Sequence, residues 1–387
     1  MEGLMLPLQE LAEYGKMKEL LRKKEAVSIS GCVDSQKLHM MAGLGEGFAV
    51  RLILTYSELR AREIAEDFRF YDRKVSVYPG KDLIFYQADI QGNQLVRERI
   101  KTLKRIAQGR PMTLVTTFST LLSPMMPLER FLHYTLHIDK KSELEEGELA
   151  GKLVTMGYEK VYQVEAPGQF SIRGGIVDIF DLTQENPYRI ELWGEEVESL
   201  RSFDILSQRS IEKLESVSIY PATELILTDE ELKSGIAGIK EEAAKQREQL
   251  RKQFLTEEAH RLTTHIKELE EEVLELKTGV NLESYIYFFL PQLQSFMDMF
   301  SGKECCVFLD EPVRIKEHLD GVELEFKESM SHRLEKGYVL PGQTRILFER
   351  EEVLAKVRKY PMAQIGFMED KAALLKTDFR FSIMAKA

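Results

Sequence analysis

The chain has 387 residues, of which 43% are hydrophobic and 30% are charged, and its formal net charge is -11. This composition is ordinary for a soluble globular protein, and the length indicates two or three domains. The acidic balance argues against a protein that coats nucleic acid without sequence preference, because contacts along the phosphates need a basic surface. A local basic patch is compatible with these totals.

The cysteines and histidines predict neither a disulfide framework nor a metal site. Cys32 stands alone, and Cys305 and Cys306 are adjacent, which indicates a reducing, cytoplasmic compartment. His133 and His137 have no third ligand nearby, so no metal is expected. The N-terminal segment lacks the apolar core of a signal peptide, and no apolar run approaches the roughly 20 residues that span a membrane. We therefore expect a cytoplasmic protein with no membrane partner.

An α/β fold is expected for residues 1–126, because strand patterns alternate with helical patterns, as in a parallel sheet. The expected strands span residues 26–30, 49–56, 75–78 and 113–117, and the expected helices span residues 8–24, 36–44, 57–68 and 95–107. Ser57 stands where an N-cap residue would begin the third of these helices.

The turn after the first expected strand is where such a sheet would bind phosphate. A P-loop requires G-x-x-x-x-G-K-[ST], in which the second glycine lets the backbone cradle phosphate and the lysine reaches the outer phosphates. Gly31 and Lys37 keep this spacing. Gln36 stands in place of the second glycine, Leu38 in place of the hydroxyl residue, and Asp34 adds a negative charge. We predict a degenerate nucleotide loop that keeps the fold and has lost the ligand.

Residues 127–222 differ in character, with short strands and turn signals at close spacing. This pattern predicts a small, mostly antiparallel α+β module inserted after the parallel sheet. Along residues 188–193, apolar and polar side chains alternate, so one strand face is apolar and the other carries Arg189 and Trp193. Arg173 lies beside a Gly-Gly turn on a preceding strand. Two arginines and the only tryptophan on a polar sheet face are typical of a protein-binding hot spot.

Two stretches of this module carry a family resemblance. They read G-Q-F-S-I-R-G-G-I-V-D-I-F at residues 168–180 and P-Y-R-I-E-L-W-G-E-E-V-E-S-L-R-S-F-D at residues 187–204. Together they resemble the UvrA-binding domain shared by the excision-repair helicase UvrB and the bacterial transcription-repair coupling factors. The continuations S-Q-R-S and V-S-I-Y-P-A-T-E, at residues 207–210 and 217–224, are closer to the coupling factors.

The resemblance implies the N-terminal, UvrB-like region of a coupling factor. The implied fold is a degenerate RecA/helicase-like parallel sheet domain at residues 1–126, an inserted UvrA-binding domain at 127–222 and a helical domain at 223–387 with strands that return to the first sheet. The connection at residues 81–93 is too short for the DNA-clamping hairpin of UvrB. The implied function is to recruit UvrA to stalled transcription complexes in nucleotide excision repair.

The resemblance also implies a division of roles. Contacts with RNA polymerase and DNA, and the ATP and magnesium of an ATP-dependent translocase, would belong to other modules of the full-length protein. This chain would have no catalytic residues and no cofactor. The implied contact residues for UvrA are Arg173, Arg189 and Trp193. Family members usually have phenylalanine at the last position, so tryptophan keeps an aromatic platform.

The contact assignment has an alternative. Arg173 and Arg189 could instead stabilise local turns by pairing with Glu191 or Glu195. Surface ion pairs of that kind contribute at most about 1 kcal/mol.

The last segment, residues 223–387, begins with a helix signal. Thr228 and Glu231 form a capping-box pattern, and one apolar stripe continues along a long helix with a break near residues 254–256. The stretch at 305–312 reads as an apolar strand that ends in two acids, Asp310 and Glu311, and this strand is expected to return to the first sheet. Further expected elements are a helix at 286–300 and strands at 344–348, 365–367 and 379–383.

Two other functions remain open from the residues alone. The first is a weak ATPase that uses Lys37, Asp310 and Glu311, since acids at the end of a strand can hold magnesium and water. The second is a DNA-binding module that uses the basic helix. The cations of that helix are Arg97, Arg99, Lys101, Lys104 and Arg105.

Overall fold

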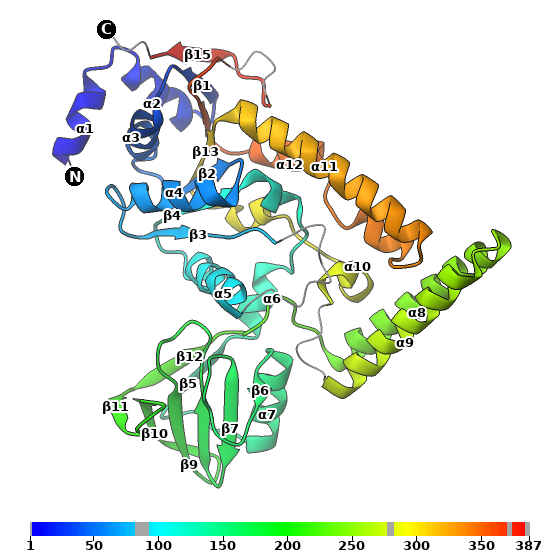
Figure 1. The fold of residues 1–387 in the computed structure, drawn as a ribbon. Helices are drawn as coiled ribbons and strands as arrows, with labels where there is room; N and C mark the ends of the chain where they lie inside the picture. Colours follow the sequence, from blue (N-terminus) through cyan, green and yellow to red (C-terminus); the bar gives the residue numbers. More distant parts are fainter. Residues whose placement is uncertain (1, 82–92, 277–281, 370–373, 384–387) are drawn as a thin grey trace.

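The computed structural model describes residues 2–81, 93–276, 282–369 and 374–383 (Figure 1). Residues 82–92, which make up most of the predicted short connection, lie outside these ranges. The described chain is an α/β structure with a large parallel sheet, a smaller and mostly antiparallel sheet, and helices. Among the described residues, no helix is both long and apolar enough to cross a membrane.

Within the described ranges, the large sheet has seven strands, and all of them are parallel. In spatial order they are β15 (Phe379–Ser382), β1 (Ala26–Ser30), β14 (Met362–Ile365), β13 (Cys305–Asp310), β2 (Val50–Thr55), β4 (Met112–Thr117) and β3 (Val75–Val77). The predicted return of the strand at 305–310 is confirmed, because β13 pairs with β2 in the middle of the sheet. The sheet therefore unites the two ends of the described chain.

Both faces of the parallel sheet are covered, as near-continuous apolar strands require. Leu52 and Leu54 of β2 belong to the core under α5, α11 and α12, whereas Ile53 points into the core under α1 to α4. The helices around the sheet are α1 (Glu2–Gln9), α2 (Tyr14–Arg22), α3 (Asp34–Leu44), α4 (Glu58–Phe68), α5 (Asn93–Ala107), α11 (Pro312–Glu335) and α12 (Arg350–Val357). The predicted cap is confirmed, since the side chain of Ser57 accepts a hydrogen bond from the backbone N–H of Arg60.

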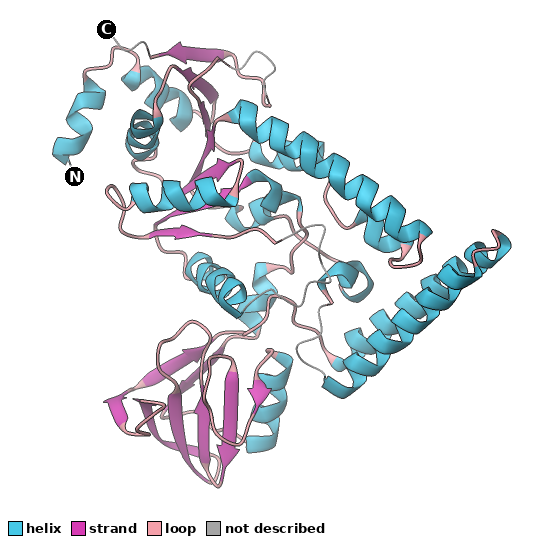
Figure 2. Cartoon of the chain, viewed as in Figure 1, coloured by secondary structure: helices cyan, strands magenta, loops and turns pink. Residues whose placement is uncertain are grey.

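The smaller sheet lies between β4 and β13 in sequence and belongs to a unit that is set apart from the large sheet (Figure 2). Its strands, in spatial order, are β11 (Ser210–Lys213), β10 (Glu196–Phe203), β9 (Tyr188–Trp193), β8 (Ile176–Ile179), β7 (Gln169–Arg173) and β6 (Glu159–Lys160). All neighbours are antiparallel except β6 and β7. Helix α7 (Glu146–Thr155) packs against the apolar face, next to a pair formed by β5 (Leu136–Asp139) and β12 (Ser216–Ile219). Helix α6 (Leu128–His133) precedes this unit.

Two long helices form a hairpin beside the rest of the chain (Figure 1). They are α8 (Asp229–Lys252) and α9 (Thr256–Leu276), and the break predicted near residues 254–256 separates them. The capping box that starts α8 is confirmed: Thr228 Oγ1 accepts from the N–H of Glu231, and the Glu231 carboxylate accepts from the N–H of Thr228.

Four expectations were wrong in this segment and in the N-terminal one. The strand expected at 365–367 lies earlier, as β14 at Met362–Ile365. The predicted strand at 344–348 overlaps the 3-10 helix η4 (Pro341–Arg345), and its apolar residue Ile346 is buried in the large core instead. The predicted helix at 286–300 stops at Pro291, leaving the short α10 (Ile286–Phe289) and the 3-10 helix η3 (Phe296–Phe300). The helix expected at 8–24 is divided between α1 and α2. Two further 3-10 helices are η1 (Phe118–Leu122) and η2 (Glu283–Tyr285).

A buried ion-pair cluster joins the parallel-sheet region to the segment that follows β12. Glu224, which follows β12, accepts hydrogen bonds from Arg99 of α5 and from Tyr78 after β3, at 2.7 and 2.9 Å. Lys81 adds a contact of 2.7 Å to the same carboxylate. Burial by itself would raise the pKa of Glu224, but Arg99 and Lys81 outweigh burial and hold the pKa of this carboxyl well below its ordinary value. The cluster therefore stabilises the fold in its ionised form.

We predict that Glu224→Gln lowers the free energy of unfolding by about 3 kcal/mol at pH 7, because it leaves two buried cations short of a counter-charge. The difference in unfolding free energy between the variant and the unchanged chain should shrink as the pH falls below about 4.5. Ionised Glu224 contributes its full stability only above the pKa of the unfolded carboxyl, and this contribution is lost as the pH falls towards the depressed pKa of the folded state. Urea denaturation at several pH values measures both effects. Glu230→Gln, an exposed change nearby, is the control, and equal losses in the two variants would contradict the account.

Candidate protein-binding site

The smaller sheet has one apolar and one polar face, as predicted from the alternation of its residues. Ile190 and Leu192 are buried against α7, whereas Arg189 of the same strand lies on the opposite face. The strand register places Arg189 directly beside Asp178 of β8 and beside Arg201 of β10. Three charged side chains therefore stand in one row across the polar face.

The buried carboxylate of Asp178 organises this face. Arg189 binds it through two hydrogen bonds, with Nε at 2.7 Å from Oδ1 and Nη2 at 2.8 Å from Oδ2. Arg173 reaches Oδ2 from the other side, with Nη2 at 3.3 Å. This hydrogen bonding with Asp178 raises the pKa of Arg189 above its ordinary value. A bidentate pair of this kind fixes the guanidinium plane as well as its position.

The two arginines stay partly open to solvent, and an aromatic side chain further along β9 belongs to the same strand face. Arg173 is 36% exposed and Arg189 is 13% exposed. Trp193, at the end of β9, is 78% exposed. The turn that ends β7 has Gly174 and Gly175 at φ of +55° and +81°, a backbone conformation that favours glycine. All three predicted contact residues are thus on one surface, next to a sharp turn.

The alternative partners predicted for the arginines were wrong. Arg173 and Arg189 pair with Asp178, whereas Glu191 accepts hydrogen bonds from Ser199 and Arg201. Sequence reasoning passed over Asp178, although it was visible as a single acid in the apolar run I-V-D-I-F. A buried acid on a strand signals a cationic partner on a neighbouring strand.

The loop at residues 31–37, predicted to be a degenerate nucleotide loop, has its lysine bound by carboxylates of the protein itself. Lys37 is only 3% exposed, and its Nζ lies 2.7 Å from Asp34, 2.7 Å from Glu311 and 3.3 Å from Asp310. Burial alone would lower the pKa of Lys37, but the three carboxylates outweigh burial and raise it. Arg60 donates to Asp310 at 3.2 Å. The three residues of the ATPase alternative lie together, but they form ion pairs with one another.

The first backbone N–H groups of this loop also have hydrogen-bond partners within the protein. In a P-loop, the amides point at the phosphates. Here the N–H groups of Gly31 and Cys32 donate to carbonyls of Phe367 and Gly366, at 3.0 and 3.3 Å. A Cβ on Gly31 would lie 2.2 Å from the carbonyl oxygen of Ile383, at the end of β15. The loop therefore serves the packing of the last strands.

The basic helix does not present a basic surface, so the structure argues against the DNA-binding alternative. Arg97 donates to the carbonyl of Gln184 at 2.8 Å, and Lys104 donates to Thr183 at 2.8 Å. Arg99 is buried in the cluster with Glu224, and Arg105 binds Ser76 and the carbonyl of Lys74. Of the five predicted cations, only Lys101 is exposed. Helix α5 uses these side chains to join the parallel sheet to the smaller unit.

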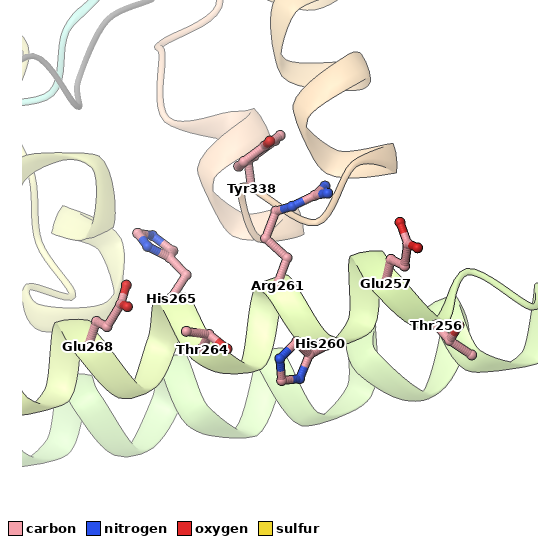
Figure 3. Close-up of a pocket in the computed structure, with 8 residues that line it drawn as sticks. All are labelled: Thr256, Glu257, His260, Arg261, Thr264, His265, Glu268 and Tyr338. Atoms are coloured by element: carbon pink, nitrogen blue, oxygen red, sulfur yellow. The ribbon is translucent and has the colours of Figure 1, made fainter.

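Another cluster of polar side chains lines a groove along α9 (Figure 3). Arg261 donates to the carbonyl of Lys336 at 2.6 Å and lies 4.7 Å above the ring of Tyr338. His265 is within 3.1 Å of the Tyr285 hydroxyl, and burial lowers the pKa of His265. These groups hold the hairpin to the rest of the chain. The described residues contain no group of three or more histidine, cysteine or acidic side chains that could hold a metal ion.

We predict that Mg-ATP will not raise the melting temperature of the chain. Lys37, the residue that would bind phosphate, already forms ion pairs with the carboxylates of Asp34 and Glu311. Lys37→Ala should instead lower the free energy of unfolding by about 3 kcal/mol without nucleotide, since it removes a cation from the buried Asp310. Thermal and urea denaturation test both statements, with the exposed Lys23→Ala as the control. A nucleotide-dependent stabilisation that disappears in Lys37→Ala would favour the ATPase alternative.

Comparisons with known proteins agree with the resemblance seen in the sequence. Residues 136–225 match the family model of the UvrB interaction domain. The chain is 32% identical over 309 residues to the transcription-repair-coupling factor of Bacillus subtilis (strain 168) and 29% identical over 348 residues to that of Staphylococcus aureus (strain MRSA252).

These alignments cover 79% and 86% of this chain but 26% and 28% of the relatives, so the chain spans about a quarter of their length. The face that carries Arg173, Arg189 and Trp193 lies inside the matched domain. The prediction from the sequence is confirmed: the chain is a relative of the transcription-repair coupling factors that carries a UvrB interaction domain, as expected of the N-terminal, UvrB-like region of such a factor.

Proposed function

We propose that this chain is a recruitment module of transcription-coupled nucleotide excision repair, and that its polar sheet face binds UvrA. The observation that carries the proposal is the cluster of Arg173, Asp178 and Arg189 beside Trp193, inside the domain that matches the UvrB interaction domain. The relatives over most of the chain are named transcription-repair-coupling factors, which supports the role in repair at stalled transcription complexes.

The proposal also assigns the parts of the chain. Residues 1–126, together with strands from residues 223–387, would be a degenerate RecA/helicase-like domain, and the remainder of 223–387 a helical domain. Residues 127–222 would be the inserted UvrA-binding domain. In support, the Lys37 loop is closed by internal ion pairs. On this view the chain is a non-catalytic scaffold, and its cytoplasmic location stays a prediction.

Other activities are proposed for modules outside this chain. ATP and magnesium would be bound, and DNA translocated, by the remaining three quarters of a coupling factor, which would also contact RNA polymerase. This chain would need no cofactor, because its proposed task is protein recognition. That assignment agrees with the internal use of both Lys37 and the cations of α5.

The chemistry of the face suits a protein partner with an acidic group. Asp178 orients the two guanidinium groups but neutralises only one of their two charges. A carboxylate of UvrA placed over Arg173 and Arg189 would thus meet oriented donors at little cost in side-chain entropy. Trp193 adds apolar area of the kind that dominates binding energy at interfaces.

We predict that Arg173→Ala and Trp193→Ala each weaken binding of purified UvrA by about tenfold or more, as expected for central contact residues. Arg173 is a cleaner test than Arg189, since Arg189 still holds Asp178 when Arg173 is removed. Isothermal titration calorimetry of the chain with UvrA measures the affinities.

The matched control is Lys152→Ala, which removes an exposed cation from α7 on the other side of the same sheet. We expect its affinity to remain within about twofold of the unchanged chain. If Arg173→Ala and Trp193→Ala also bind UvrA with unchanged affinity, the assignment of the face is wrong.

A further inference from the structure

The polar sheet face continues beyond the three predicted contact residues on both sides. On one side, the guanidinium of Arg173 lies 5.5 Å from the centre of the Tyr162 ring. Tyr162 follows β6 and is 84% exposed, so its ring has one face against Arg173 and the remainder in solvent. A guanidinium over an aromatic ring restrains both groups.

On the other side, Arg189 holds the turn between β10 and β11. Its guanidinium lies 4.1 Å from the centre of the buried Phe203 ring, and its Nη2 donates to Gln208 Oε1 at 2.8 Å. Gln208 in turn donates to the carbonyl of Ile205 at 2.7 Å. Leu206, within this turn, is 95% exposed.

The turn that carries Leu206 is rigid. The carboxylate of Asp204 accepts from the N–H and the hydroxyl of Ser207, at 2.8 and 2.7 Å. The N–H of Gln208 donates to the carbonyl of Asp204 at 2.8 Å, and Gln208 has a left-handed φ of +57°. These hydrogen bonds restrain the backbone on either side of Leu206, so the turn has little backbone entropy left to lose on binding.

These contacts form a continuous line from Tyr162 through Arg173, Asp178 and Arg189 to Gln208. The line ends at the turn that carries Leu206, where Gln208 binds the carbonyl of Ile205. Its two ends are large apolar groups in water, and its centre is a pair of guanidinium groups with one unneutralised charge. Single exposed apolar residues are common on protein surfaces, but two of them fixed to the same charged cluster indicate a contact surface.

We infer that the UvrA-binding surface extends along this line, and that Tyr162 and Leu206 are further anchors on either side of the arginines. This inference rests on the proposed function. The complementary surface of UvrA then presents a carboxylate for the two guanidinium groups, flanked by two apolar pockets. Exposed apolar anchors around a desolvated charge also keep water away from the central ion pair, which strengthens it.

The test compares UvrA affinities of the chain, three variants of the proposed anchors and one control variant by calorimetry. Tyr162→Ala and Leu206→Ala should each bind UvrA about tenfold more weakly or worse, whereas Tyr162→Phe should bind within about twofold of the unchanged chain, because it keeps the ring. Phe254→Ala is the matched control, since Phe254 is 90% exposed at the tip between α8 and α9. All of these side chains are exposed, so the melting temperatures should be unchanged.

The UvrA affinity of Arg173→Ala, measured in parallel, distinguishes a failure of the extended surface from a failure of the proposed function. If it weakens binding while Tyr162→Ala or Leu206→Ala behaves like Phe254→Ala, the extended line is overturned and the proposed function stands. If Arg173→Ala also has no effect, or if UvrA does not bind the unchanged chain, the proposed function fails and the inference fails with it.

Discussion

A buried carboxylate needs cations or hydrogen-bond donors as partners, and the cations that this chain supplies determine where it can interact with other molecules. In the part of the chain that the structure describes, three carboxylates at structurally central positions are each bound by two cations. The clusters are Asp310 with Lys37 and Arg60, Glu224 with Lys81 and Arg99, and Asp178 with Arg173 and Arg189. In the first two, the cations are almost entirely enclosed. At Asp178, one arginine remains about one third exposed, and exposed aromatic groups stand near it.

This difference links the fold to its proposed role. The first cluster closes the place where a parallel sheet of this kind would hold phosphate, so the sheet serves as a support. The second uses the basic helix to attach the smaller unit firmly to that support. The third presents oriented guanidinium groups to the outside. The proposed protein-binding face and the Lys37 cluster therefore lie in different parts of the fold, the first on the smaller sheet and the second at the large parallel sheet.

Local patterns in the sequence were sufficient for much of this. Alternation along β9 placed Arg189 and Trp193 on one face. Gln36 and Leu38, which replace the glycine and the hydroxyl residue of a P-loop, indicated the loss of the phosphate cradle. Long-range partners were not predictable. Asp178 was overlooked: its place in an apolar run hinted at burial, but nothing local identifies the two arginines that bind it. The contact of Gly31 with Ile383 joins positions at opposite ends of the chain. The strand expected at residues 344–348 failed because burial of Ile346 in the large core overrides local strand preference.

The central claim is that UvrA meets the polar face of the smaller sheet and leaves the closed nucleotide loop untouched. Hydrogen exchange of the chain with and without UvrA tests this most directly. The account predicts slower exchange on UvrA binding in the turns that border the face, at residues 160–163, 174–175 and 204–209, and no change at residues 31–37. Slower exchange at residues 31–37 or along α5, with the three turns unchanged, would contradict it.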